Sequence, residues 1–408
     1  MHICVLGAGI VGLACAWELR RQGHEVTLID QATPGAGTSS GNGAQLSYSY
    51  VAPLADASIW GQLPHLLLAA DSPLKLRPRL DPHQWRWGLA FLAACNARTA
   101  ADSTARLLSL AAVSRVGFEA MRAELAPDCD FSATGKLVVY RSAAGVEAAR
   151  RQIELQQRLG APAQAIVTPG ECAALEPALA QYAREIAGGV HTPSECAADC
   201  LKVCQALAAA LAQRGVRFAL GHAAEAFELR SGRVQAVQTA AGPVRADVFV
   251  MALGTASVRL GRQLGAYLPV YPLKGYSITV PVDTAPGAAP RVSVTDTARK
   301  TVFARLGGRL RVAGMAELVG EDLSTPRDRI DTLIAATRAV FPQAARDFDA
   351  PQAWAGLRPA TPRGTPIVGR VGGAPANMLF NTGHGALGFT LAFGTAAEIA
   401  AQVAATTP

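Results

Sequence analysis

Three glycines and one aspartate near the N-terminus have the residue types and the spacing to bind a dinucleotide. Gly7, Gly9 and Gly12 form the pattern Gly-x-Gly-x-x-Gly, and Asp30 follows 18 residues after the last of them. The first glycine permits a tight turn, the second lets the backbone approach a pyrophosphate, and the third lets a helix pack closely on a strand. A carboxylate at the position of Asp30 accepts hydrogen bonds from ribose hydroxyls and would repel a 2′-phosphate. These residues predict a site for FAD or NAD, and the pattern alone does not choose between them.

The elements around these residues form a complete βαβ unit. Residues 2–6 are typical of a buried strand, residues 13–22 have a helical pattern, and residues 25–30 are typical of a second strand. The pyrophosphate would lie at the N-terminus of the helix, where free N–H groups and the helix dipole favour negative charge. The next segment, residues 35–45, is small, polar and rich in backbone donors. It suits an extended dinucleotide, although its composition also fits an ordinary surface loop.

A second glycine-rich segment precedes a helix near the C-terminus. Residues 381–390 read Asn-Thr-Gly-His-Gly-Ala-Leu-Gly-Phe-Thr and lead into an alanine-rich helix that reaches about residue 405. Backbone donors and a helix dipole suit the electron-rich edge of a flavin ring, and an NAD enzyme has no obvious use for them. This segment favours FAD over NAD. His384 is either a structural histidine or a pocket residue, and the sequence leaves both interpretations open.

Length and composition set the class of protein. The chain has 408 residues, half of them hydrophobic and 17% charged, which predicts two or three folded domains. The net charge of +7 rests on five lysines and 33 arginines that are scattered along the chain, so we expect no nucleic-acid partner. Eight cysteines in so long a chain are too few for a disulfide framework and indicate reduced thiols in a cytoplasmic protein.

We expect neither a signal peptide nor a membrane-spanning helix. The apolar run at residues 3–17 has no basic segment before it and is interrupted by three glycines. No run of about 18 strongly apolar residues occurs elsewhere in the chain. The protein is expected to be soluble or, at most, bound to a membrane surface.

Two further clusters have competing interpretations. Cys196, Cys200 and Cys204 recur every four residues on a predicted helix, where buried small residues are expected rather than metal ligands, and no metal site is predicted. Trp85 and Trp87 flank Arg86, and could form a basic aromatic patch for a membrane surface or a partner. An amphipathic segment that packs on its own domain is the interpretation we favour.

The remaining pattern predicts an α/β fold with two domains. Residues 63–150 are mainly helical around an irregular connection at 72–82, while residues 136–140 and 188–191 are strands. Residues 247–251 are typical of a returning Rossmann strand before Gly254, and residues 270–312 of an antiparallel sheet. We therefore predict a Rossmann-type FAD-binding domain (1–50, 194–260 and 352–408) with a discontinuous α+β substrate domain built on an antiparallel sheet (51–193 and 261–351).

Six blocks of sequence, taken in order, resemble the FAD-dependent bacterial D-amino acid dehydrogenases of the wider D-amino acid oxidase and glycine oxidase group. The blocks are residues 5–12, 38–42, 72–81, 272–279, 356–359 and 381–385. The chain departs from that family at Gly43-Ala44, where Ala-Gly is usual, at Tyr48-Ser49, where Pro-Gly is typical, and at Arg363, where Asp is common. The first two departures lie near the expected flavin and substrate cleft and bear on the range of substrates.

The resemblance implies roles for particular residues. Arg358, which stands directly before Pro359, would bind the substrate carboxylate, and Tyr276 would donate its hydroxyl to the same group. A guanidinium matches a carboxylate with two parallel hydrogen bonds, which makes this role chemically sound. Secondary pocket candidates are Tyr50, Lys274 and His384. The implied FAD-binding residues are Gly7, Gly9, Gly12, Asp30, Thr38, Ser39, Asn42, Gly254, Gly385, Leu387, Gly388 and Thr390.

The implied enzyme is an FAD-dependent oxidoreductase that acts on CH–NH2 donors in amino-acid catabolism. Hydride would pass from Cα of a D-amino acid to flavin N5, and water would hydrolyse the imino acid to a 2-oxo acid and ammonia. Electrons would go to a quinone or another carrier, with the protein in the cytoplasm or at the cytoplasmic face of the inner membrane. The alternatives are an oxidase or dehydrogenase of a secondary amine (sarcosine, glycine or D-proline/hydroxyproline type), and a flavin-carrying subunit of an electron-transfer complex.

Overall fold

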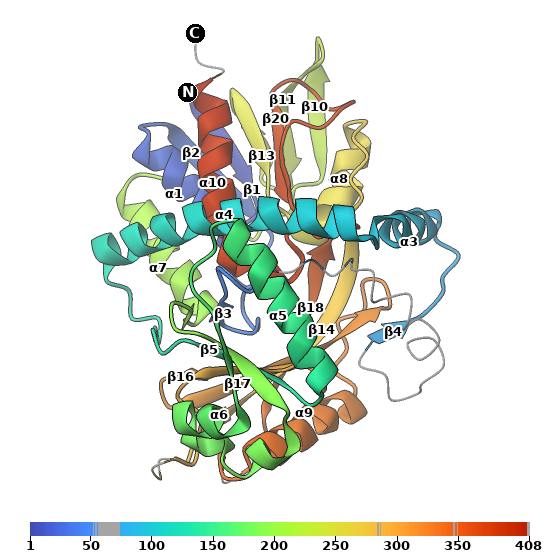
Figure 1. Ribbon diagram of the computed structural model, residues 1–408. Helices are drawn as coiled ribbons and strands as arrows, with labels where there is room; N and C mark the ends of the chain where they lie inside the picture. Colours follow the sequence, from blue (N-terminus) through green and yellow to red (C-terminus); the bar gives the residue numbers. More distant parts are fainter. Residues whose placement is uncertain are drawn as a thin grey trace.

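The computed structural model describes the chain except for residues 52, 54, 56–73, 284, 286, 346, 349 and 406–408. Two sheets dominate the molecule, one above the other in the view of Figure 1, and helix α4 (Ala97–Leu125) crosses between them.

The upper sheet has six strands in the order β19-β20-β13-β1-β2-β9. They are β1 (His2–Leu6), β2 (Glu25–Asp30), β9 (Arg217–Leu220), β13 (Val248–Met251), β19 (Ile367–Gly369) and β20 (Met378–Thr382). All are parallel to their neighbours except β19. The inner strands are apolar along their length because both faces of the sheet are covered. The parallel pairing of β1 with β2 and of β1 with β13 confirms the predicted βαβ unit and the returning strand.

Helices α1 (Ile10–Arg21), α7 (Cys200–Gln213) and α10 (Gly388–Ala404) share one apolar core against the upper sheet. The other face packs on α8 (Ser257–Gln263) and on a three-stranded sheet of β10 (Ala226–Arg230), β11 (Arg233–Thr239) and β12 (Gly242–Arg245). Helix α10 lies between α1 and α4. At Gly394 an added Cβ would lie 2.2 Å from the carbonyl oxygen of Leu110, so glycine there permits close approach of α10 and α4.

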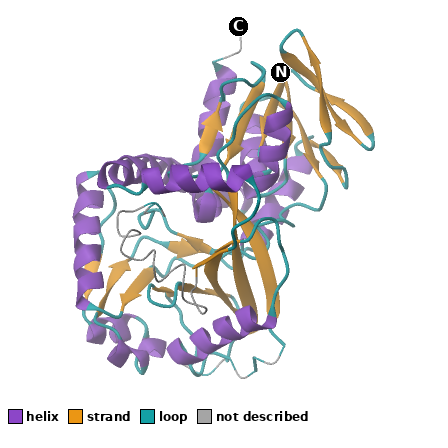
Figure 2. Cartoon of the chain, turned by 90° about the vertical axis from the view of Figure 1, so that its right-hand side faces the viewer, coloured by secondary structure: helices purple, strands orange, loops and turns teal. Residues whose placement is uncertain are grey.

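The lower sheet is larger and mostly antiparallel, in the order β18-β14-β17-β16-β15-β5-β7-β6, with β4 paired to β17 (Figure 2). Its strands are β4 (Leu74–Leu76), β5 (Lys136–Tyr140), β6 (Ala165–Val167), β7 (Gly188–Thr192), β14 (Tyr271–Pro281), β15 (Ser293–Asp296), β16 (Thr301–Leu306), β17 (Arg309–Leu318) and β18 (Gln352–Ala360). Helix α9 (Arg327–Val340) packs on one face of it. The other described elements are α3 (Pro82–Ala94), α5 (Ala143–Arg158), α6 (Pro169–Leu175), β3 (Gln45–Leu46), β8 (Cys196–Ala197) and the short helices η1 (Pro177–Leu179), η2 (Tyr182–Glu185), η3 (Gly254–Ala256) and η4 (Gly385–Leu387).

This architecture confirms the predicted α/β class with a Rossmann-type unit and a sheet of different orientation. The domain boundaries stay predictions, although residues 352–360, which we assigned to the FAD-binding domain, pair with β14 in the lower sheet. The prediction that Cys196, Cys200 and Cys204 lie on one helix was wrong for Cys196. Helix α7 begins at Cys200 because Asp199 caps it, and Cys196 lies in β8. Residues 63–73 of the predicted helical region lie outside the described residues.

One stretch of the described residues, Gly385–Ala404, is long and apolar enough to cross a membrane by length and composition. It consists of η4 and α10, and most of its side chains are buried against α1 and α4. These contacts are those of a core helix.

Candidate functional site

Three glycine turns meet at one edge of the upper sheet. Gly7 follows β1, Gly254 follows β13 and Gly383 follows β20, so each turn stands at the carboxyl end of a parallel strand. All three glycines have positive φ, of 109°, 58° and 82°. At Gly7 an added Cβ would lie 2.5 Å from the carbonyl oxygen of Ala252, so no other residue fits there. The carboxyl edge of a doubly wound sheet is where such folds bind nucleotides.

The start of helix α1 forms an open cradle at this edge. A Cβ on Gly12 would lie 1.8 Å from the carbonyl oxygen of Gly7, whereas the nearest atom to a Cβ on Gly9 is Ser39 Oγ at 3.5 Å. Gly12 is therefore a packing requirement, and Gly9 leaves space above the helix N-terminus. The N-cap residue of α1, Gly9, supplies no side-chain cap, and the first turn of the helix holds no acidic residue. Ser39 Oγ accepts a hydrogen bond from the N–H of Ile10 at 3.1 Å, so its hydroxyl lies at the same helix start.

Asp30 stands at the end of β2, next to the first glycine turn. One carboxylate oxygen accepts the N–H of Ala8 at 2.6 Å and the other accepts the N–H of Ala32 at 2.9 Å. The side chain is partly exposed, so it keeps acceptor capacity toward solvent. The free N–H groups at the helix start are donors that suit a pyrophosphate. The carboxylate of Asp30 beside them is an acceptor that suits ribose hydroxyls.

The loop after β2 ties the upper sheet to the lower one. Thr38 Oγ1 donates to the carbonyl oxygen of Leu357 at 3.0 Å, and Ser277 Oγ donates to that of Gly41 at 2.7 Å. Asn42 Oδ1 accepts the backbone N–H two residues later and shapes the turn. These bonds place the predicted FAD-binding loop against β14 and β18.

The second predicted helix start lies at the same edge. Gly385 has φ of 56° with open space at its Cβ position, and the nearest atom to a Cβ on Gly388 is 3.8 Å away. Helix α10 begins after Leu387 with no side-chain cap and no acidic residue in its first turn. Thr390 Oγ1 accepts the N–H of Ser47 at 3.2 Å and is buried. Two uncapped helix starts and an open glycine cradle fit a dinucleotide cofactor such as FAD.

Arg358 lies on β18, opposite these turns. Its guanidinium covers Gly275 of β14, since a Cβ there would be 2.3 Å from Nη2 and 2.4 Å from Cζ. We call the face of the lower sheet that carries Gly275, Ser277 and Arg358 the inner face. It faces the upper part of the molecule, because Ser277 reaches the loop after β2 and because β18 contacts η3 and η4.

A β-bulge orients the guanidinium. Lys274 of β14 pairs with Glu317 of β17, but Tyr276 pairs with Gly314, so two residues of β17 oppose one residue of β14. Within the bulge Met315 has φ of 60°, in the left-handed region. Its carbonyl oxygen leaves the ladder and accepts a hydrogen bond from Arg358 Nη1 at 2.8 Å. Such a conformation is disfavoured for a non-glycine residue and is typical of functional sites.

The electrostatics of Arg358 favour binding of an anion. Within the described part of the chain no carboxylate forms an ion pair with it, and its hydrogen bond goes to a neutral carbonyl. Burial alone lowers its pKa to about 10, so it stays protonated at neutral pH. A half-buried cation without a carboxylate partner has already lost part of its hydration, so a substrate carboxylate can bind it at a lower desolvation cost.

Tyr276 and Lys274 do not share this site. Side chains alternate along a strand, so both lie on the outer face of β14, where Tyr276 packs in the α9 core. Tyr276 Oη donates to Glu317 Oε2 at 2.7 Å, and burial raises its pKa. Lys274 Nζ donates to Asp322 at 2.9 Å. Tyr276 and Arg358 therefore lie on opposite faces of the sheet, which contradicts the prediction that they bind the same substrate carboxylate. Lys274, predicted as a pocket residue, also points away from Arg358.

His384 and Tyr50 lie in packed surroundings. His384 Nε2 lies 3.1 Å from Thr395 Oγ1, and burial lowers its pKa to about 3, so the ring is neutral. This geometry gives His384 a structural position against α10. The ring of Tyr50 lies under the ammonium of Lys136, 4.4 Å from its centroid, and burial raises the Tyr50 pKa.

Lys136 and Trp354 were not identified from the sequence as candidate site residues, although both lie on the inner face. Lys136 is buried, donates to Ser47 Oγ at 2.8 Å, and has its pKa lowered to about 8 by burial. Trp354 spreads over two glycines, because a Cβ on Gly41 or Gly356 would lie 2.2 or 2.0 Å from its ring. Period-two alternation backwards from Arg358 places Trp354 on the same face, and that signal was available in the sequence.

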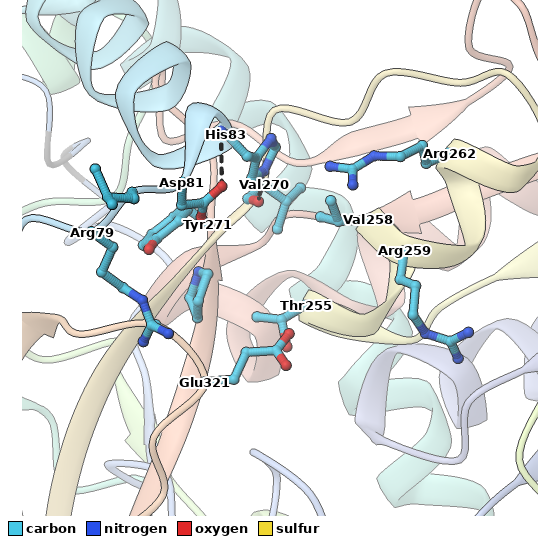
Figure 3. A pocket seen from close by; sticks show the side chains of 13 residues that line it. Arg79, Asp81, His83, Thr255, Val258, Arg259, Arg262, Val270, Tyr271 and Glu321 are labelled. Carbon is cyan, nitrogen blue, oxygen red and sulfur yellow. Dashed lines mark hydrogen bonds between the residues drawn. The ribbon is translucent and has the colours of Figure 1, made fainter.

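A cleft of about 590 Å³ opens where the upper and lower parts of the molecule meet (Figure 3). Its apolar wall includes Val258, Val270 and Tyr271, and its charged residues include Arg79 and Glu321. Thr255 of η3, directly after the turn at Gly254, also lines it. The cleft therefore reaches the edge at which the glycine turns meet.

Comparison with known proteins places this geometry in a wider group. Residues 2–402 match the model of the family DAO, described as FAD dependent oxidoreductase. The chain is 48% identical to D-amino acid dehydrogenase 2 of Ralstonia nicotianae, over 100% of this chain and 97% of that protein. It is 45% identical to D-amino acid dehydrogenase 2 of Pseudomonas aeruginosa, over 98% and 94% of the two chains.

Solved structures share the fold. Glycine oxidase from Geobacillus kaustophilus aligns with a TM-score of 0.78 at 21% identity, covering 100% of this chain and 95% of that one. L-proline dehydrogenase from P. horikoshii aligns with a TM-score of 0.76 at 18% identity, covering 100% and 94%. At these identities the likeness concerns the arrangement of the elements.

Proposed function

Because the chain belongs to the DAO family of FAD-dependent oxidoreductases, we propose that it converts D-amino acids to 2-oxo acids and ammonia. The substrate loses two electrons and two protons, water hydrolyses the resulting imino acid, and a quinone or another carrier takes up the electrons. The observation that carries the assignment to an amino acid is Arg358, a half-buried guanidinium on the inner face that lacks a carboxylate partner among the described residues.

Arg358 binds and orients the substrate carboxylate in this proposal. The carbonyl oxygen of Met315 holds Nη1, so the fork is fixed before substrate arrives and its other N–H groups remain for the carboxylate. A two-point contact to the carboxylate fixes the position of Cα, which lowers the entropic cost of reaching the reactive arrangement. Trp354 is placed to pack against the substrate because it lies on the same face, with only Gly356 between the two positions on that face.

The upper part of the molecule holds the cofactor. FAD, when bound, supplies the acceptor for the hydride that leaves Cα. The start of α1 at Gly9 would stabilise the charge of the pyrophosphate, and Asp30 would accept hydrogen bonds from ribose hydroxyls. The backbone N–H groups at Gly385 and Gly388 would donate hydrogen bonds to the flavin.

A substrate panel tests the proposed function. The FAD-loaded protein is mixed with D-amino acids, L-amino acids, sarcosine and glycine, and reduction of a soluble dye is followed. We expect D-amino acids to be oxidised and their L-isomers to be inert. Oxidation of sarcosine with no turnover of any D-amino acid would instead assign a secondary amine as substrate.

Arg358→Leu tests the role of the guanidinium in the same assay. Loss of a charge-assisted carboxylate pair costs about 1.5–3 kcal/mol, so KM should rise roughly 10- to 150-fold. Arg150→Leu, on the exposed surface of α5, is the matched control and should leave KM unchanged. An unchanged KM in Arg358→Leu would remove Arg358 from the substrate site.

A further inference from the structure

The motif Lys274-Gly275-Tyr276 puts a glycine on the inner face of β14 and two polar side chains on its outer face. The guanidinium of Arg358 crosses Gly275 and reaches the carbonyl oxygen of Met315 on the next strand, β17. The glycine is required, because a side chain there would occupy the place of the guanidinium. Its two polar neighbours face away from Arg358, and the proposed function gives them no part.

Both polar neighbours bind the stretch of chain that follows the bulge at Met315. Tyr276 Oη donates to Glu317 Oε2 at 2.7 Å, two residues after Met315. Lys274 Nζ donates to Asp322 Oδ2 at 2.9 Å, in the loop that follows β17. Side chains of β14 therefore hold β17 on the outer face, at the far side of the bulge.

Helix α9 supplies a third charged group to the same place. Arg329 lies on α9, which packs against β14 and β17 and lies below them in Figure 1. Its Nη2 lies 2.8 Å from Glu317 Oε1, so each carboxylate oxygen of Glu317 has its own partner. Tyr276, Glu317 and Arg329 are buried, with exposed fractions of 1%, 5% and 6%. We name these three residues the outer-face cluster.

Packing alone does not account for the outer-face cluster. A buried ion pair loses to desolvation much of what the attraction returns, and apolar residues of similar volume often stabilise a fold equally well. The surrounding core is apolar, since Met315, Ile330 and Leu333 pack in it. What the charged groups add is direction, because satisfied hydrogen bonds and ion pairs in a buried network select one local arrangement of β17.

We propose that the outer-face cluster positions Arg358 through the sheet by holding the bulge at Met315. The inference rests on the proposed function, in which Arg358 binds the substrate carboxylate. With Glu317 fixed, Met315 keeps its left-handed conformation and presents its carbonyl oxygen to Arg358 Nη1 on the inner face. Without that restraint Met315 relaxes to an ordinary strand conformation, and the guanidinium loses its anchor. The three members of the cluster are positioning residues, because they act on the substrate only through Arg358.

Binding of a simple carboxylate in a double-mutant cycle tests the proposal. Benzoate has a carboxylate and no amine to oxidise, and its dissociation constant is read from the flavin absorption band of the FAD-loaded protein. We expect Tyr276→Phe and Glu317→Gln each to weaken benzoate binding by about 2- to 30-fold, the range for substitutions that act through intervening residues. KM for a D-amino acid should rise in parallel. Added to Arg358→Leu, Tyr276→Phe should change the dissociation constant no further.

Tyr182→Phe is the matched control. Tyr182 is a buried tyrosine that donates its hydroxyl to a buried carboxylate of the same sheet, that of Asp296 on β15. Strand β16 separates β15 from the bulged strand, so this variant should lose a similar hydrogen bond and bind benzoate like the parent. Tyr276→Phe removes one oxygen and keeps the ring in the core, so it tests the proposal even if Glu317→Gln does not fold.

The outcomes separate this proposal from the proposed function. Benzoate binding in Tyr276→Phe that equals binding in the parent would overturn the positioning role. Equal weakening by Tyr276→Phe with and without Arg358, or by Tyr182→Phe, would overturn it too, because the effect would then not pass through Arg358. A parent that binds benzoate through Arg358 but oxidises no D-amino acid would overturn only the proposed function.

Discussion

Gly275→Ala offers a way to displace Arg358 without removing its charge. The added Cβ would lie 2.3 Å from Nη2 and 2.4 Å from Cζ, and the guanidinium must move by about 1 Å to restore a van der Waals contact. The guanidinium is the far end of a flexible side chain, so this movement costs the fold little. A misplacement of about 1 Å in a substrate-positioning group lowers the rate by about 100-fold. We therefore expect kcat/KM for a D-amino acid to fall by about two orders of magnitude.

The assay is steady-state dye reduction by the FAD-loaded variant, with the flavin absorption spectrum as a check on cofactor content. Thermal stability should be equal to or slightly above that of the parent, because alanine loses less conformational entropy than glycine in a strand. Gly308→Ala, in the turn before β17 with open space around its Cβ, is the matched control and should keep full activity. A kcat/KM within about threefold of the parent in Gly275→Ala would refute the placement of Arg358 over this glycine.

Three further predictions concern the cofactor site, a buried histidine and a helix contact. Asp30→Ala should weaken FAD binding roughly 5- to 150-fold, measured by titrating the apoprotein with FAD, because about 1–3 kcal/mol of hydrogen bonding is lost; unchanged affinity would contradict the role of Asp30. His384 has a folded pKa of about 3 against 6.5 when unfolded, so the unfolded chain binds the extra proton and stability falls as pH drops below about 6.5. Between pH 6.5 and 5 this loss is at most about 2 kcal/mol, and urea unfolding should show it in the parent and not in His384→Gln. Gly394→Ala should lower the free energy of unfolding by about 1–3 kcal/mol, since its Cβ would lie 2.2 Å from the carbonyl oxygen of Leu110 on α4; an unchanged urea midpoint would mean that the helices separate freely.

Local patterns were sufficient for the first βαβ unit. Gly7, Gly9, Gly12 and Asp30 are placed by contacts within a short stretch of chain, and the structure sets them at one sheet edge as the spacing predicted. Arg358 was found from the motif Gly-x-Arg-Pro through a family resemblance, and its surroundings depend on strands far apart in the chain.

Register explains why Tyr276 was misplaced. Neighbouring residues of a strand point to opposite faces of the sheet. Of Lys274, Gly275 and Tyr276, either Gly275 alone or the other two can therefore face a site on one side of the sheet. Which of them face the site depends on pairing with β17 and β18, and the bulge at Met315 is set by that pairing. The sequence carries no local signal for a left-handed methionine, because its conformation is imposed by tertiary contacts.

Cys196 and Trp85 also show that local residue spacing alone does not determine where a side chain lies. A spacing of four residues suggested one helix for three cysteines, but the cap at Asp199 starts α7 only at Cys200. Apolar periodicity in α3 is equally strong on two faces, so the sequence alone did not tell which tryptophan is buried.

Anaerobic mixing of the purified, FAD-loaded chain with single amino acids tests the central claim most directly, because it needs no external electron acceptor. We predict that D-amino acids bleach the flavin absorption band within the mixing experiment, that the same L-amino acids leave it unchanged, and that Arg358→Leu requires far higher D-amino acid concentrations for the same bleaching. A flavin band that no D-amino acid bleaches would contradict the account.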